Sequence, residues 1–157
     1  MSDNNFEVKL AILADILIKK KDALQAILNI CENQENLYST PSTPERRDFL
    51  VQMGKEKQVQ IDEVLACDEM FQGIFNSISE NFQELGKEYK ERVLTLQTGI
   101  SEVMEMDVKI RIQEDKTKTA AQEAWGKMAK TSSSAAKEIT PLNKNYIIDQ
   151  YNKNRRK

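Results

Sequence analysis

Histidine is absent from this chain of 157 residues. Because imidazole is the usual general base near neutral pH and the commonest ligand of zinc and iron, its absence weighs against most hydrolytic and metal-dependent chemistry. The sequence also has no phosphate-binding glycine loop, no G-x-S-x-G motif and no C-x-x-C motif. We therefore expect a protein that is not an enzyme, with no catalytic residue, no cofactor and no metal site.

Glycine and proline are scarce, with five and three residues respectively. So few turn-forming residues favour long elements over a many-stranded fold. The longest apolar stretch, Leu10–Ile18, contains Asp15 and is too short to span a bilayer. Residues 1–5 also lack the basic region of a secretory signal. We expect a cytoplasmic protein of one domain, without stable membrane insertion.

The two cysteines, Cys31 and Cys67, lie far apart in the sequence, and each is flanked by apolar residues of a helical pattern. We expect both to be small, buried side chains in a reducing compartment. On two antiparallel helices that turn near residue 41, their sulfurs would lie about 24 Å apart along the helix axes. This distance excludes a disulfide bond between them.

Charge is nearly balanced overall but unevenly distributed. The chain has 23 Lys and Arg against 25 Asp and Glu, a net charge of −2. Residues 127–157 contain eight basic and two acidic residues, so this end has a charge of +6 and residues 1–126 have −8. The overall balance does not indicate nucleic acid as a partner.

A heptad pattern of apolar residues runs through most of the chain and is typical of helices packed nearly side by side. In the first predicted helix, residues 4–38, only Lys20 interrupts the pattern, and the helix should be about 50 Å long. The apolar positions of this helix are Phe6, Leu10, Leu13, Leu17, Leu24, Ile27 and Cys31.

The segment 39–44 predicts a loop followed by a new helix. Thr43 is a suitable N-cap and Pro44 a suitable first helical residue, and a loop this short makes the second helix antiparallel to the first. We place the next turn near Leu85-Gly86, with residues 76–81 as the alternative. The heptad positions of the second helix are Leu50, Gly54, Lys57, Ile61, Val64, Asp68, Phe71, Phe75, Ile78, Phe82 and Leu85.

The third predicted helix keeps the pattern only in its first half. Its apolar positions are Tyr89, Val93, Leu96, Ile100, Val103 and Ile110, with Asp107 as an exception. Beyond Ile112 the same positions are small or polar (Glu114, Thr117, Ala121 and Ala124), and we expect this part to bury little. The predicted core of the three helices includes Leu17, Leu24, Ile61, Phe71, Leu96 and Ile100.

The sequence thus predicts an all-α fold, an antiparallel three-helix bundle of long, coiled-coil-like helices with a short C-terminal helical segment. We assign residues 1–130 to the bundle and residues 131–157 to a Ser-rich linker and a partner-binding segment. Thr140-Pro141 is a second helix start of the same kind as Thr43-Pro44. The candidate partner-binding residues follow it: Leu142, Tyr146, Ile147, Ile148 and Tyr151. A short fourth helix folded back on the bundle is an equal alternative for this segment.

Two smaller features allow more than one interpretation. The run Lys19-Lys20-Lys21 could bind phosphate or a membrane, but consecutive residues spread around a helix, so we favour solvated charge. Met104 and Met106 diverge by about 200° on a helix, so we expect one of them to be exposed. An exposed methionine favours an adaptable binding surface.

Several stretches of the sequence resemble FlgN-type flagellar export chaperones, over about residues 5–118. The run GKEKQVQIDEVL at 54–65, continued by DEMF at 68–71, is similar to the second helix of that family. The runs LQTGI at 96–100 and IRIQE at 110–114 are similar to its third helix. The length of the first helix and the short Ser/Pro loop fit as well.

The resemblance implies a type III secretion chaperone. Such a protein keeps flagellar hook-associated (hook-filament junction) proteins from assembling in the cytoplasm and delivers them to the export gate. Family members bind the apolar terminal helices of these proteins through their own C-terminal helix, where a tyrosine helps docking at the gate. Tyr146 and Tyr151 are both candidates for that tyrosine.

The residues leave two other functions open. A structural coiled-coil scaffold or adaptor would pair its heptad positions with a second copy and form a stable homodimer, whereas a chaperone would be a monomer or a weak homodimer. A helical hairpin that binds RNA through the basic end would bind in a salt-sensitive manner.

Overall fold

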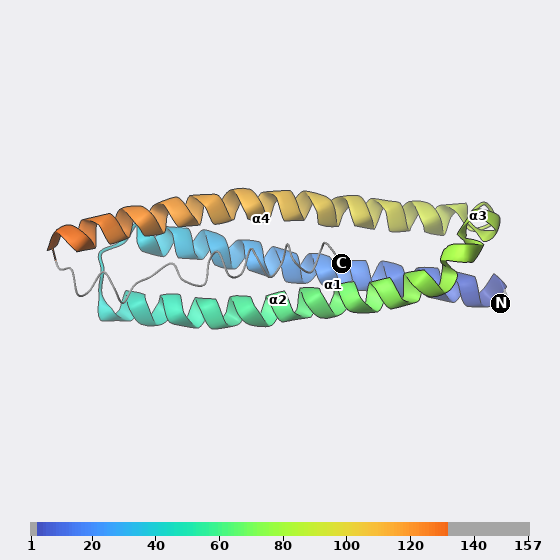
Figure 1. The fold of residues 1–157 in the computed structure, drawn as a ribbon, viewed down its shortest axis with the longest axis horizontal. Coiled ribbons are helices and arrows are strands. Elements are labelled where there is room, and N and C mark those ends of the chain that lie inside the picture. The colour runs from blue at the N-terminus through green and yellow to red at the C-terminus, as the bar shows by residue number, and fades with distance from the viewer. Residues whose placement is uncertain (1–2, 132–157) are drawn as a thin grey trace.

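The computed structural model describes residues 3–131. Four α-helices account for most of them: α1 (Asp3–Tyr38), α2 (Pro44–Ile78), α3 (Phe82–Leu85) and α4 (Lys90–Thr131), with a 3₁₀ turn at Ser79–Asn81 between α2 and α3. These residues contain no strand. The predicted all-α bundle of long helices is therefore confirmed (Figure 1). None of the described helices is both long and apolar enough to cross a membrane.

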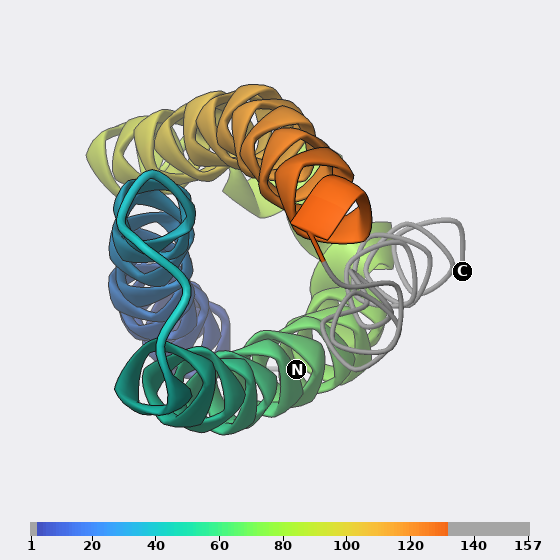
Figure 2. The ribbon, with the colours of Figure 1, turned by 90° about the vertical axis from the view of Figure 1, so that its left-hand side faces the viewer.

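Helix α1 lies between the other two long helices. It packs along both α2 and α4, whereas the backbones of α2 and α4 approach each other at no more than isolated points. Seen end-on, the three helices form an arc that is open on one side (Figure 2). Helix α2 runs antiparallel to α1, as the short loop between them predicted, whereas α4 runs parallel to α1 and antiparallel to α2 (Figure 1).

The loop between α1 and α2 has the predicted geometry. The Thr43 hydroxyl accepts a hydrogen bond from the backbone N–H of Arg46 at 3.1 Å, and Pro44 is the first residue of α2. Arg46 is itself buried, donates to the carbonyl oxygen of Thr40 at 2.6 Å, and lies over the ring of Tyr38 at 5.9 Å. This arginine therefore ties the end of α1, the loop and the start of α2 together.

The second turn uses both of the positions that the sequence offered. Helix α2 ends at Ile78, within the alternative region 76–81, and the chain completes its reversal after α3, around Gly86. Gly86 is in the right-handed region with φ −60°, so it does not end the helix by a left-handed conformation. A Cβ at this position would collide with the carbonyl oxygen of Phe82, so this approach favours glycine.

The predicted core is confirmed except at two positions. Leu17, Leu24, Ile61 and Leu96 are buried, and Phe71 is half-buried against the core. The prediction for Ile100 is wrong, because its side chain is 37% exposed.

Gly99, and not Ile100, faces α1. A Cβ on Gly99 would lie 3.0 Å from Cδ1 of Leu17. The α4 positions that face α1 and the core therefore follow Leu96, Gly99, Val103 and Met106, a 3-4-3 spacing. Because a glycine leaves no apolar signal, the pattern of apolar residues in the sequence did not reveal this spacing.

The expectation that α4 buries little beyond Ile112 is also wrong. Five residues in this part are buried: Gln113, Glu114, Thr117, Ala121 and Ala124. Polar and small side chains can be buried when they find hydrogen-bond partners or allow close helix approach, and the partners here lie mainly on α1 and α2.

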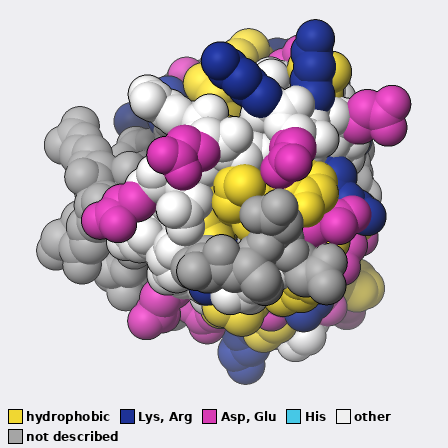
Figure 3. All heavy atoms as spheres, turned by 90° about the vertical axis from the view of Figure 1, so that its right-hand side faces the viewer, with side chains coloured by type: hydrophobic (Ala, Val, Ile, Leu, Met, Phe, Trp, Pro, Cys, Tyr) yellow, Lys and Arg dark blue, Asp and Glu magenta, His cyan; other side chains and the backbone are white. Residues whose placement is uncertain are grey.

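Aromatic side chains close the end of the bundle that contains α3. The ring of Phe6 on α1 lies 5.9 Å from that of Phe82 and 5.8 Å from that of Tyr89. Phe75 on α2 joins the same group, 5.8 Å from Phe82. Figure 3 shows hydrophobic side chains near the middle of this end face, with charged side chains around them. These contacts join the start of α1 to the α2–α4 connection.

The corrected packing of α4 predicts opposite outcomes for two neighbouring residues. Leu96→Ala should lower the free energy of unfolding by about 2–5 kcal/mol, because it leaves a cavity in the core. Ile100→Ala should lower it by less than about 1 kcal/mol, because that side chain is partly solvated. Urea unfolding followed by circular dichroism measures both, and equal losses would contradict the assignment of Gly99 to the α1 contact.

Candidate functional site

The candidate partner-binding residues predicted from the sequence lie outside the described residues. They are Leu142, Tyr146, Ile147, Ile148 and Tyr151. The functional features that the described residues present are a buried polar cluster between the three long helices and an exposed apolar surface on α4.

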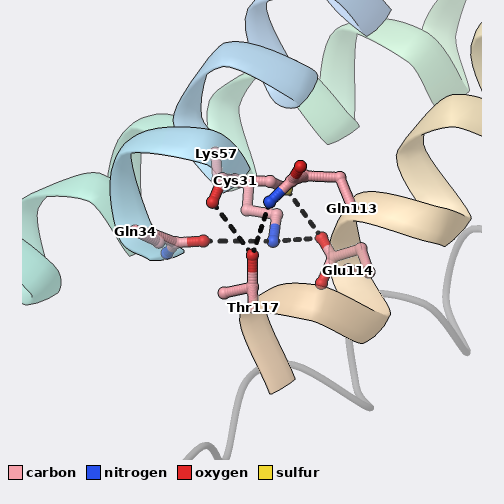
Figure 4. Close-up of polar contacts among 6 residues, drawn as sticks. All are labelled: Cys31, Gln34, Lys57, Gln113, Glu114 and Thr117. Atoms are coloured by element: carbon pink, nitrogen blue, oxygen red, sulfur yellow. Dashed lines mark hydrogen bonds and ion pairs between the residues drawn. The ribbon is translucent and has the colours of Figure 1, made fainter. Parts of the chain in front are cut away.

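Lys57 and Glu114 form an ion pair inside the bundle (Figure 4). Lys57 projects from α2 and Glu114 from α4, and their side chains are only 2% and 1% exposed. The Cys31 thiol of α1 donates a hydrogen bond to Oε1 of Glu114 at 3.0 Å. All three long helices therefore meet at this ion pair.

Further polar side chains surround the pair. Lys57 also lies 3.5 Å from the side-chain oxygen of Gln34, and the Thr117 hydroxyl donates to the carbonyl oxygen of Cys31 at 2.9 Å. Gln113 donates to Glu35 at 2.8 Å. The second oxygen of Glu114, Oε2, is buried without a hydrogen-bond partner in the part of the chain that the structure describes.

Four charged residues at heptad positions are paired across helices. Lys57 interrupts the pattern in α2 and contacts Glu114 in α4. Lys20, the interruption in α1, contacts Asp68 in α2 at 2.5 Å, with the two side chains 13% and 21% exposed. The apolar pattern did not predict these pairs, although opposite charges at heptad positions of different helices were a signal for them.

The lysine run 19–21 is likewise engaged by acidic side chains. Lys19 lies 4.0 Å from Glu63 and Lys21 lies 2.8 Å from Glu102, in addition to the Lys20 contact. Each lysine therefore contacts a neighbouring helix of the same chain. This arrangement argues against a phosphate-binding patch at the run.

Neither cysteine has the environment of a reactive thiol. Both are free and buried, which confirms the prediction that no disulfide joins them. Burial raises the pKa of Cys31 to about 12, with Glu114 adding to the rise and Lys57 opposing it. Burial also raises the pKa of Cys67. Because the thiolate is the nucleophile, a thiol kept protonated in this way is inert near neutral pH.

The cluster cannot act on a solute, because its ionic groups are sealed from solvent. Its role is structural. A buried ion pair gives little net stability over apolar side chains, but removing one partner leaves an uncompensated charge. Among residues 3–131, no group of three or more Cys, Asp or Glu side chains could hold a metal ion.

A row of apolar side chains lies exposed on α4. Ile100, Met104, Val108 and Ile112 recur every fourth residue and are 37–56% exposed. Met104 is exposed whereas Met106 is buried, as the angle between them predicted. A four-residue spacing places these side chains along one side of the helix. We call these four residues the α4 row.

A shallow apolar groove lies between α1 and α4, on a different side of α4 from the α4 row. Its volume is about 350 Å³, and its apolar lining includes Ala14, Leu17, Ile18, Leu94 and Gly99. The groove follows from the close approach at Gly99, where no side chain fills the space between the helices. Both apolar surfaces therefore depend on how α4 is rotated against α1.

No protein-family model, curated protein or solved structure matches this chain. The resemblance to FlgN-type chaperones therefore remains a prediction from the sequence.

The buried ion pair predicts that the effects of substituting Lys57 and Glu114 on the free energy of unfolding are strongly non-additive. Lys57→Met should cost about 3–5 kcal/mol of unfolding free energy, because Glu114 is left charged and unpaired in the core. Adding Glu114→Leu should restore most of that loss, since the remaining side chains are apolar and of similar size. Urea denaturation of both variants measures the two values.

Lys21→Met is the matched control, because its partner Glu102 is exposed and such pairs contribute about 0–1 kcal/mol. A double variant as unstable as Lys57→Met alone would refute the assigned ion pair.

Proposed function

We propose that this chain is a cytoplasmic export chaperone of the FlgN type. In this proposal it binds flagellar hook-associated proteins, keeps them from assembling prematurely and delivers them to the export gate. Support comes from the sequence resemblance, from the long-helix bundle and from the exposed α4 row. In this proposal the partner is contacted by Leu142, Tyr146, Ile147, Ile148 and Tyr151, and the α4 row provides a second apolar surface.

The observation that carries this proposal is the α4 row. A helix partner buries its apolar face in a complementary apolar surface and is anchored by side chains spaced three or four residues apart. The spacing of Ile100, Met104, Val108 and Ile112 matches such anchors. Met104 at the middle of the row can adapt to more than one partner side chain.

The chemistry of the partner follows from the same surface. Hook-associated proteins assemble through apolar terminal helices, so a chaperone has to cover these helices until export. Covering an α4-row side chain with a partner would contribute about 1 kcal/mol, since each is roughly half-exposed and full burial contributes about 1.5–3 kcal/mol. Several such contacts give a reversible complex, as delivery requires.

Removing the C-terminal segment should abolish partner binding without unfolding the bundle. Truncation after residue 138 leaves the described core of α1, α2 and α4 intact, so the variant should unfold cooperatively. Isothermal titration with purified hook-associated proteins measures binding, and thermal circular dichroism measures folding. Unchanged affinity would overturn the assignment of Leu142–Tyr151 as the contact segment.

A charge in the α4 row should weaken partner binding by roughly tenfold, the equivalent of about 1.4 kcal/mol. Val108→Glu introduces a carboxylate that has to be desolvated in the complex. Val59→Glu is the control, because Val59 on α2 lies outside the row and is 63% exposed, against 53% for Val108. Equal affinities of the two variants in the same titration would exclude the row from the interface, and a stable dimer that binds no partner would favour the scaffold.

A further inference from the structure

The three long helices are arranged like three members of a four-helix bundle. In such a bundle each helix packs against two neighbours and lies diagonally across from the third. Here α1 packs against both α2 and α4, and α2 and α4 do not pack along each other. The end-on view shows the same arrangement, with one side of the arc open (Figure 2). The position diagonal to α1 is the one that no described helix occupies.

The side chains beside this unoccupied position are large at one end of the bundle and small at the other. Towards α3, the large rings of Phe71, Phe75 and Phe82 pack against the core. Towards the end of α4, the buried side chains are small, as at Thr117 and Ala121. The end with the smaller buried side chains is the one where α1 and α4 finish and α2 begins (Figure 1).

Helical spacing identifies the residues that lie on the facing sides of α2 and α4 at this end. Lys57 and Glu114 meet, so they mark the sides of α2 and α4 that are turned towards each other. Gly54 is one turn before Lys57 on the same side of α2, and Trp125 is three turns after Glu114 on the same side of α4. A Cβ added at Gly54 would meet no atom within 4 Å, so the space beside this residue is open.

The chain itself provides a segment of suitable position, length and charge. Helix α4 ends at Thr131, at this end of the bundle, and 26 residues follow it. Residues 132–139 are as long as ordinary helix–helix connections, which have about 2–8 residues. A helix over residues 141–154 would span about 20 Å, less than half the length of α2. Residues 132–157 contain six basic and two acidic residues, against an acidic excess in residues 1–131.

We propose that residues 141–154 bind back to the bundle as a short fourth helix, between α2 and α4 and beside Gly54. Large side chains such as Leu142, Tyr146 and Ile147 then complement the small ones of α2 and α4. This inference rests on the proposed function in one respect, because it takes the segment that docks to be the same segment that contacts the partner. Docking and partner binding therefore exclude each other, and the free chaperone keeps its apolar segment covered.

Amide hydrogen exchange on the full chain, without any partner, tests the docking. Residues 141–154 should exchange at least about tenfold more slowly than a free peptide of the same sequence, because docked helices protect their amides. Gly54→Leu fills the open space and should remove this protection. Gly73→Leu is the matched control, because Gly73 is also on α2 and also has no atom within 4 Å of an added Cβ. The control should leave the protection unchanged.

Peptide-like exchange of residues 141–154 in the unaltered chain would overturn the docking, and so would equal protection in the two glycine variants. Protection that rises with protein concentration would also overturn it, because the segment would then bind a second copy of the chain. The competition has a separate readout. If docking is right, Gly54→Leu should bind hook-associated proteins more tightly than Gly73→Leu. Protected amides together with no partner binding in any variant would leave the docking in place and refute the proposed function alone.

Discussion

The buried contact between Lys57 and Glu114 is the constraint on which the rest of the bundle depends. Two charges removed from water must stay together, because separating them costs several kcal/mol. Apolar heptad positions alone tolerate shifts of one helix along another by whole heptads. Lys57 can meet Glu114 in one alignment only, and the Lys20–Asp68 contact, three turns further along α2, sets the alignment of α1. The pairs thus select one register among several of similar apolar burial.

That register decides which part of α4 faces solvent. With Glu114 held beside Lys57 and Cys31, Gly99 comes to lie against Leu17. Ile100 is then turned outwards, in line with Met104, Val108 and Ile112, and the apolar surface of α4 exists for this reason. The α4 row is therefore exposed because of the buried contact between Glu114 and Lys57. This contact connects the core of the protein to its proposed function.

The bundle also has two unlike ends. Aromatic rings from different elements hold the α3 end together through contacts of 5.8–5.9 Å, which suits a permanent closure. The opposite end has small buried residues on α4 and an open space beside Gly54. An exchangeable helix fits the second end better than the first, because small residues lose few contacts when their neighbour leaves. The proposed docking and the proposed partner binding both use this difference.

The sequence by itself determined the helices, their antiparallel order, the Thr43-Pro44 start of α2 and most of the core, because heptad spacing and capping residues are local signals. Only the tertiary structure decided the rotation of α4, the exposure of Ile100 and the burial of Gln113, Glu114 and Thr117. A glycine contact leaves no apolar signal, and a polar residue at a heptad position is stable only if its partner is present on another helix. Such pairings join residues up to 86 positions apart, as in the Thr117–Cys31 hydrogen bond, so they exist only once the chain has folded.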